Sequence, residues 1–150
     1  MKSAFLLIIC FLFFGLMSFS QDVPEISLIH KNGGRKNSTL KIRFGFITQN
    51  DSTTVYCDIY NKKFEKKIPI KEYNDIINLV KKISSSDILS RDDLYLDASE
   101  STISLKNMQS SVSFSISALH HNDNRKEYLH FKNAVEKILN VVELNLTDLR

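Results

Sequence analysis

Cysteine is nearly absent from this chain, and its scarcity excludes a fold held together by disulfides. The 150 residues contain two cysteines, Cys10 and Cys57. Cys10 lies in an apolar N-terminal run that we expect to be removed, so Cys57 remains alone and has no internal partner. Because Cys57 alternates with Val55 and Ile59, we predict a small buried hydrophobe rather than a reactive or intermolecular thiol.

Glycine and excess charge are also scarce, and each absence argues against a class of function. The four glycines, Gly15, Gly33, Gly34 and Gly45, form no phosphate-cradling loop and no Gly-x-Ser-x-Gly nucleophile elbow. The net charge of +3 is too small to favour binding to nucleic acid or to an anionic membrane. We therefore expect neither a cofactor nor a nucleic-acid partner.

Long apolar runs are missing as well, except at the start of the chain. Lys2 precedes an apolar stretch over residues 4–17, and a Ser-x-Ser sequence ends at Ser20. A positive start, an apolar centre and small residues before a junction are typical of a secretory signal peptide. We predict a signal over residues 1–20, cleaved before Gln21, and an exported protein that is periplasmic or secreted.

Two alternatives for this N-terminal segment fit less well. A membrane-spanning helix needs roughly 20 apolar residues, and the run over 4–17 is shorter. A lipoprotein would need small residues before Cys10, but Leu7, Ile8 and Ile9 stand there. No later segment approaches a membrane span, so none is expected after signal cleavage.

Period-two alternation predicts strands in two groups. Residues 21–38 show no clear period and are interpreted as a lead-in, whose apolar positions between 23 and 29 can dock as a short edge strand. Beyond them, apolar and polar residues alternate over 40–47, 55–60, 64–68, 94–97, 103–105 and 112–118. Each of these segments has one apolar face, which predicts a sheet with one buried and one wet side.

Two segments instead carry the 3.6-residue period of an amphipathic helix. The first apolar stripe runs from Tyr73 to Ile83 and the second from Tyr128 to Val142. Short connections between strands favour antiparallel pairing. We therefore predict one α+β domain over 39–150, a single antiparallel sheet of about five to six strands with both helices packed on one face.

Polar residues suggest no catalytic site and no metal site. His120, His121 and Asp123 are residue types that bind zinc, but adjacent histidines on extended backbone point in opposite directions. The acids Asp97 and Glu100 fit a strand-connecting turn better than the carboxylate pair of a hydrolase. A small exported hydrolase or metal-binding protein that uses His120, His121 and Asp123 is the alternative function.

The face of the sheet opposite the helices is the candidate binding surface. Tyrosines with small serines and basic residues are typical of surfaces that recognise proteins. The plain alternative is a solvated surface without a partner. The candidate binding residues are Lys41, Arg43, Tyr56, Tyr60, Ser113 and Ser115.

The pattern of the whole chain resembles that of periplasmic immunity proteins, which bind and neutralise a secreted toxin. The resemblance lies in a signal peptide, a strand-rich α+β domain and an amphipathic helix near the C-terminus, and it assigns no family residues. It implies a non-enzymatic protein-binding domain, an immunity protein or inhibitor, whose partner is a toxin or an envelope protein. An envelope-assembly or structural protein is a further alternative.

Cleavage of the signal gives a direct prediction. The intact mass of the exported protein should correspond to a chain that starts at Gln21, either free or cyclised to pyroglutamate. Mass spectrometry of the exported fraction measures this start. Recovery of the full-length chain in washed membranes would show that the apolar segment is retained.

Overall fold

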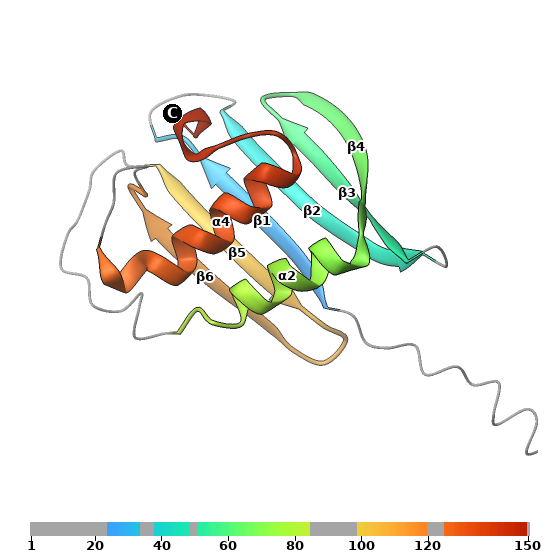
Figure 1. The fold of residues 1–150 in the computed structure, drawn as a ribbon. Coiled ribbons are helices and arrows are strands. Elements are labelled where there is room, and N and C mark those ends of the chain that lie inside the picture. Colours follow the sequence, from blue (N-terminus) through green and yellow to red (C-terminus); the bar gives the residue numbers. More distant parts are fainter. Residues whose placement is uncertain (1–23, 34–37, 49–50, 85–98, 120–124, 150) are drawn as a thin grey trace, which may run out of the picture.

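A computed structural model describes residues 24–33, 38–48, 51–84, 99–119 and 125–149 (Figure 1). The described residues form one six-stranded antiparallel sheet with two α-helices on one of its faces, which confirms the predicted α+β fold. The strands are β1 (Glu25–Lys31), β2 (Thr39–Thr48), β3 (Ser52–Ile59), β4 (Lys62–Pro69), β5 (Glu100–Lys106) and β6 (Ser111–Ser117). The predicted strand over 94–97 lies outside the described residues.

The order of strands in the sheet is β4-β3-β2-β1-β5-β6, so β1 lies near the middle. This corrects the prediction that residues 21–38 are a lead-in with a short edge strand, and it extends the domain upstream of residue 39. β1 pairs with β2 on one side and with β5 on the other. One of the two partners of β1, β5, is distant in sequence, and local periodicity does not reveal such a pairing.

Each helix begins directly after a short segment of defined backbone conformation. α2 (Ile70–Val80) starts after Pro69, whose extended backbone ends β4. A short 3₁₀ turn, η1 (Lys126–Tyr128), leads into α4 (Leu129–Val141). A second 3₁₀ turn, η2 (Leu146–Asp148), follows α4. In the described part of the chain, neither helix is long and apolar enough to cross a membrane.

The core lies between the helices and the inner face of the sheet (Figure 1). The apolar stripes of α2 and α4 are buried as predicted, including Tyr73 and Val80 on α2 and Phe131 and Ile138 on α4. An ion pair of 3.7 Å between Glu72 and Lys137 joins the two helices. The inner side chains of the central strands are fully buried: Ile26, Leu28, Leu40, Ile42 and Phe44.

Burial increases along β6 toward its C-terminal end. Ile116 is buried, Phe114 is half-buried against the core, and Val112 is 43% exposed. The turn that joins β5 to β6 extends beyond α2, so the helices do not cover that end of the hairpin (Figure 1). Phe114, which the alternation over 112–118 places on the apolar face, is therefore not fully enclosed, whereas Ile138 on α4 is.

This gradient of burial predicts unequal costs of truncation. Ile138→Ala should lower the free energy of unfolding by about 2–5 kcal/mol, because it leaves a cavity in the core. Leu129→Ala is the matched control on the same helix, since Leu129 is 50% exposed, and it should cost under about 1 kcal/mol. Phe114→Ala should fall between them, below the ~3–5 kcal/mol of a fully buried phenylalanine. Chemical denaturation measures all three, and equal costs at positions 129 and 138 would contradict the helix orientation.

One buried polar pair interrupts the apolar core. His30 on β1 lies directly opposite Ser101 on β5, and its Nδ1 lies 2.9 Å from the Ser101 hydroxyl oxygen. The His30 side chain is fully buried, and its Nε2 has no hydrogen-bond partner among the described residues. Burial lowers the pKa of His30 from its ordinary value, while the backbone of Leu149 and the side chain of Asn32 approach the ring and oppose part of this effect. The fold therefore favours neutral His30.

His30 gives the stability a defined pH dependence. In the unfolded chain His30 has its ordinary pKa of 6.5, while in the folded protein its pKa is lower. As the pH falls through 6.5, the unfolded state therefore binds more protons than the folded state. The free energy of unfolding should therefore decrease as the pH falls from about 7.5 to about 5, where carboxylates stay largely ionised. His30→Gln should flatten this slope. His130→Gln, at an exposed site on α4, should keep it, and identical slopes in both variants would refute the assignment.

Candidate functional site

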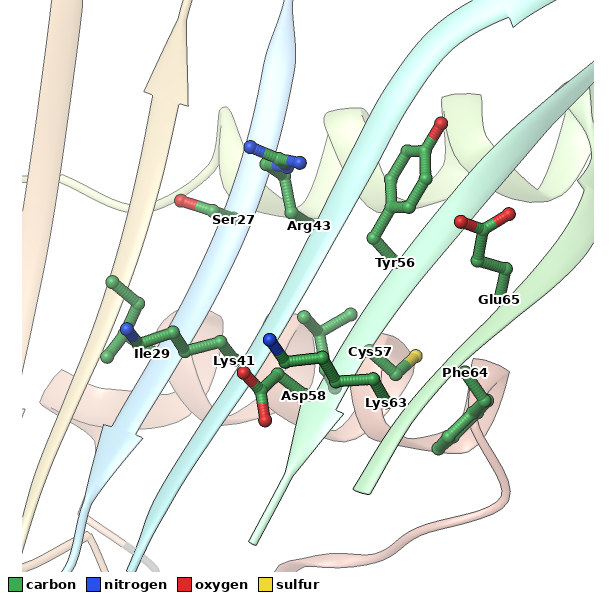
Figure 2. A pocket seen from close by; sticks show the side chains of 11 residues that line it. Ser27, Ile29, Lys41, Arg43, Tyr56, Cys57, Asp58, Lys63, Phe64 and Glu65 are labelled. Atoms are coloured by element: carbon green, nitrogen blue, oxygen red, sulfur yellow. The ribbon is translucent and has the colours of Figure 1, made fainter. Parts of the chain in front are cut away.

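The outer face of the sheet, opposite the helices, carries two rows of side chains that cross four strands (Figure 2). Strand register sets each row, because residues directly opposite one another project to the same side. The first row is Ser27, Arg43, Tyr56 and Glu65, and the second is Ile29, Lys41, Asp58 and Lys63. These rows bring together β1, β2, β3 and β4.

The two rows line a depression with a volume of about 510 Å³, which we call the outer-face depression. Its charged side chains comprise three cations, Lys41, Arg43 and Lys63, and two carboxylates, Asp58 and Glu65. Because Asp58 lies between Lys41 and Lys63 in the second row, positive and negative groups alternate across the strands. The depression therefore presents alternating charge beside the aromatic residues Tyr56 and Phe64.

Tyr56 sits in the depression because Gly45 leaves room for its ring. A Cβ atom at Gly45 would lie 2.8 Å from Cε2 of Tyr56, closer than side chains pack. The guanidinium carbon of Arg43 lies 5.4 Å from the centroid of the same ring, within range of a cation–π interaction. Arg43 also approaches Glu25, at 3.8 Å between Nε and Oε1. Gly45, Arg43 and Glu25 together define where the tyrosine and the guanidinium lie.

Beyond β1, the same two rows continue as hydroxyl groups. Ser27 lies opposite Ser104, which pairs with Ser113. The hydroxyl oxygens of Ser104 and Ser113 are 2.8 Å apart. In the second row, the hydroxyls of Thr102 and Ser115 are also 2.8 Å apart. Ser113 and Ser115 thus lie on the outer face as the alternation predicts. Over β5 and β6, these two rows therefore consist of small, uncharged hydroxyl residues that bond to each other.

Tyr60 does not belong to this surface, which corrects its prediction as a partner of Tyr56. The chain leaves the strand at Tyr60 and Asn61, where φ is 50° and 70°. Positive φ values at a tight turn redirect the side chain away from the strand's alternation. The Tyr60 hydroxyl donates instead to the Asp148 carbonyl oxygen at 2.9 Å, in η2. Tyr60 therefore ties the turn after β3 to the segment that follows α4.

Several residues of the depression are not among those predicted from the sequence. Ser27 and Ile29 lie in the predicted lead-in, Glu65 lies in the predicted strand over 64–68, and Lys63 directly precedes that strand. Asp58 was assigned to the outer side of its strand but not to a site. The alternation of strand 62–69 and its register against β3 is the signal that identifies Lys63 and Glu65.

Cys57 is a core residue, as predicted, and not a nucleophile. Its side chain is 4% exposed, on the inner side of β3. Burial raises the pKa of the thiol to about 11, and the positive charge of Lys66 offsets only part of that increase. Since the thiolate is the reactive species, Cys57 is protonated and unreactive near neutral pH.

The candidate histidine site at His120, His121 and Asp123 lies outside the described residues. His130 is exposed on α4. Among the residues that the structure describes, no three His, Cys, Asp or Glu side chains gather closely enough to hold a metal ion.

Comparisons with known proteins add no family to this geometry. The chain matches no protein-family model, and no curated protein is significantly similar to it.

Proposed function

We propose that this protein is a non-enzymatic binding domain that docks a partner protein on the outer face of its sheet. The observation that carries the proposal is the outer-face depression, where charged and aromatic side chains from β2, β3 and β4 converge beside β1 on a face that no described helix covers. A sheet face that contacts only solvent would not require these side chains to line a common depression. A concave surface with few, well-placed polar groups is the usual form of a binding site.

Tyr56 is the anchor of the proposed interface. It is 38% exposed, and Gly45 and Arg43 hold its ring in place, so binding costs little side-chain entropy. Tyrosine and arginine are the residues that most often dominate the energy of protein interfaces. The neighbouring serines and threonine are small, so a partner can approach the sheet closely over β5 and β6.

The charge of the depression favours an acidic partner. Its three cations exceed its two carboxylates, and Lys41 and Lys63 flank the one carboxylate of their row. Complementary charge accelerates association more than it strengthens the final complex. The predicted signal peptide and the resemblance to periplasmic immunity proteins support an exported partner, a toxin or enzyme that this domain neutralises.

Site-specific photo-crosslinking tests which face binds. A photoreactive amino acid at position 56 should capture one dominant partner in cells that export the protein. The same group at Lys71, exposed on α2, is the matched control and should capture that partner weakly or not at all. Equal capture from both positions would reject the outer face as the docking surface.

The captured partner then permits a quantitative prediction. Tyr56→Ala should weaken binding by about 2 kcal/mol or more, because it removes the anchor, while leaving the fold intact. Tyr60→Phe should leave affinity unchanged, since Tyr60 lies away from this face. Arg43→Glu should mainly slow association, with a larger effect at low salt, whereas Lys71→Glu should change it little. Surface plasmon resonance measures these rates, and unaltered affinity in Tyr56→Ala would overturn the proposal.

A further inference from the structure

The two edges of the sheet differ sharply in charge. β4 at one edge contains four lysines, one glutamate and a terminal proline in the sequence KKFEKKIP. Lysine and proline are the residues that natural proteins use to prevent an edge strand from pairing with another chain. β6 at the other edge reads SVSFSIS and contains no charge and no proline. Among the described residues, β6 is the last strand of the sheet and pairs with β5 alone.

The sequence of β6 is symmetric about its central residue in the chemical type of its side chains. Small hydroxyl residues stand at every odd position from 111 to 117, and apolar residues stand at 112, 114 and 116, symmetric about Phe114. An antiparallel pair of identical strands relates each residue to its mirror position in the other copy. In such a pair, hydroxyl would meet hydroxyl and apolar would meet apolar along the whole strand.

We infer that two copies of this protein associate through antiparallel pairing of β6 with β6, centred on Phe114. The pairing places Val112 opposite Ile116 of the second copy and Ser113 opposite Ser115 of the second copy. It joins two six-stranded sheets into one continuous sheet across a two-fold axis. This inference is independent of the binding proposed for the outer-face depression, which lies at the far half of the sheet.

Exposed apolar surface on β6 supports a second copy as the occupant. Val112 is 43% exposed and Phe114 is half-buried, because the helices do not cover this part of the hairpin. Two-fold pairing would bring Val112 and Phe114 of each copy against the same apolar row of the other. On the outer side, the Ser104–Ser113 and Thr102–Ser115 hydroxyl pairs would continue into the second sheet. No like charges would face each other across β6.

A pair of lysine variants tests the edge. Val112→Lys places a charge on the proposed edge, and Phe64→Lys places one on the opposite edge at a residue of the same 43% exposure. The full mature chain should sediment as a dimer in a concentration-dependent manner. Val112→Lys should raise the dissociation constant of the dimer by roughly tenfold or more. Phe64→Lys should leave it unchanged, and circular dichroism should show both variants folded.

Cysteine cross-linking tests the register without relying on a disruptive variant. Ser113→Cys mixed with Ser115→Cys should oxidise to a disulfide-linked pair, because these positions lie opposite each other in the proposed register. Each variant alone should cross-link at least several-fold less. A chain that remains monomeric at hundreds of micromolar overturns the inference. So does a dimer that Val112→Lys leaves intact, or cross-linking that is no stronger in the mixture than in either variant alone.

Discussion

The register of the antiparallel strands is the constraint on which the other features of this protein depend. Side chains alternate between the two faces, so one choice of pairing buries Ile26, Leu28 and Ile42 and at the same time places Ser27, Ile29 and Arg43 on the outer face. A slip of one residue in any strand would send its apolar set to water. The helices enforce the register, because they can cover only a face that is apolar throughout. The polar outer face is therefore a product of the same constraint that builds the core.

Local periodicity predicts what each segment forms but not which segments become neighbours. Helical stripes in the sequence predict the helices of 70–80 and 129–141. Alternation predicts the strands of 39–48, 52–59 and 111–117. The place of β1 does not, because its partner β5 lies about seventy residues further along the chain, as the His30–Ser101 pair shows. Likewise, nothing in the alternation signals that the turn at Tyr60 has positive φ.

The candidate site shows the same division. Lys41, Arg43 and Tyr56 were identified because each lies on the polar side of a strongly alternating strand. Ser27 and Glu65 join them only through pairing across neighbouring strands, which no single segment encodes. The two rows continue over β5 and β6 as uncharged hydroxyl residues, while over β2 to β4 they carry Lys41, Arg43 and Lys63. These two parts of the face suit different contacts, and both lie opposite the helices.

The central place of β1 also decides when this chain can fold. β1 is the first of the described strands along the chain, yet its ladder with β5 requires residues up to 106. Until then, one side of β1 has no partner, and the buried histidine has no serine opposite it. Pairings between residues so far apart in sequence form slowly, because a long loop must close first. The described sheet is therefore complete only once β5 is available to pair with β1, whatever order the other strands form in.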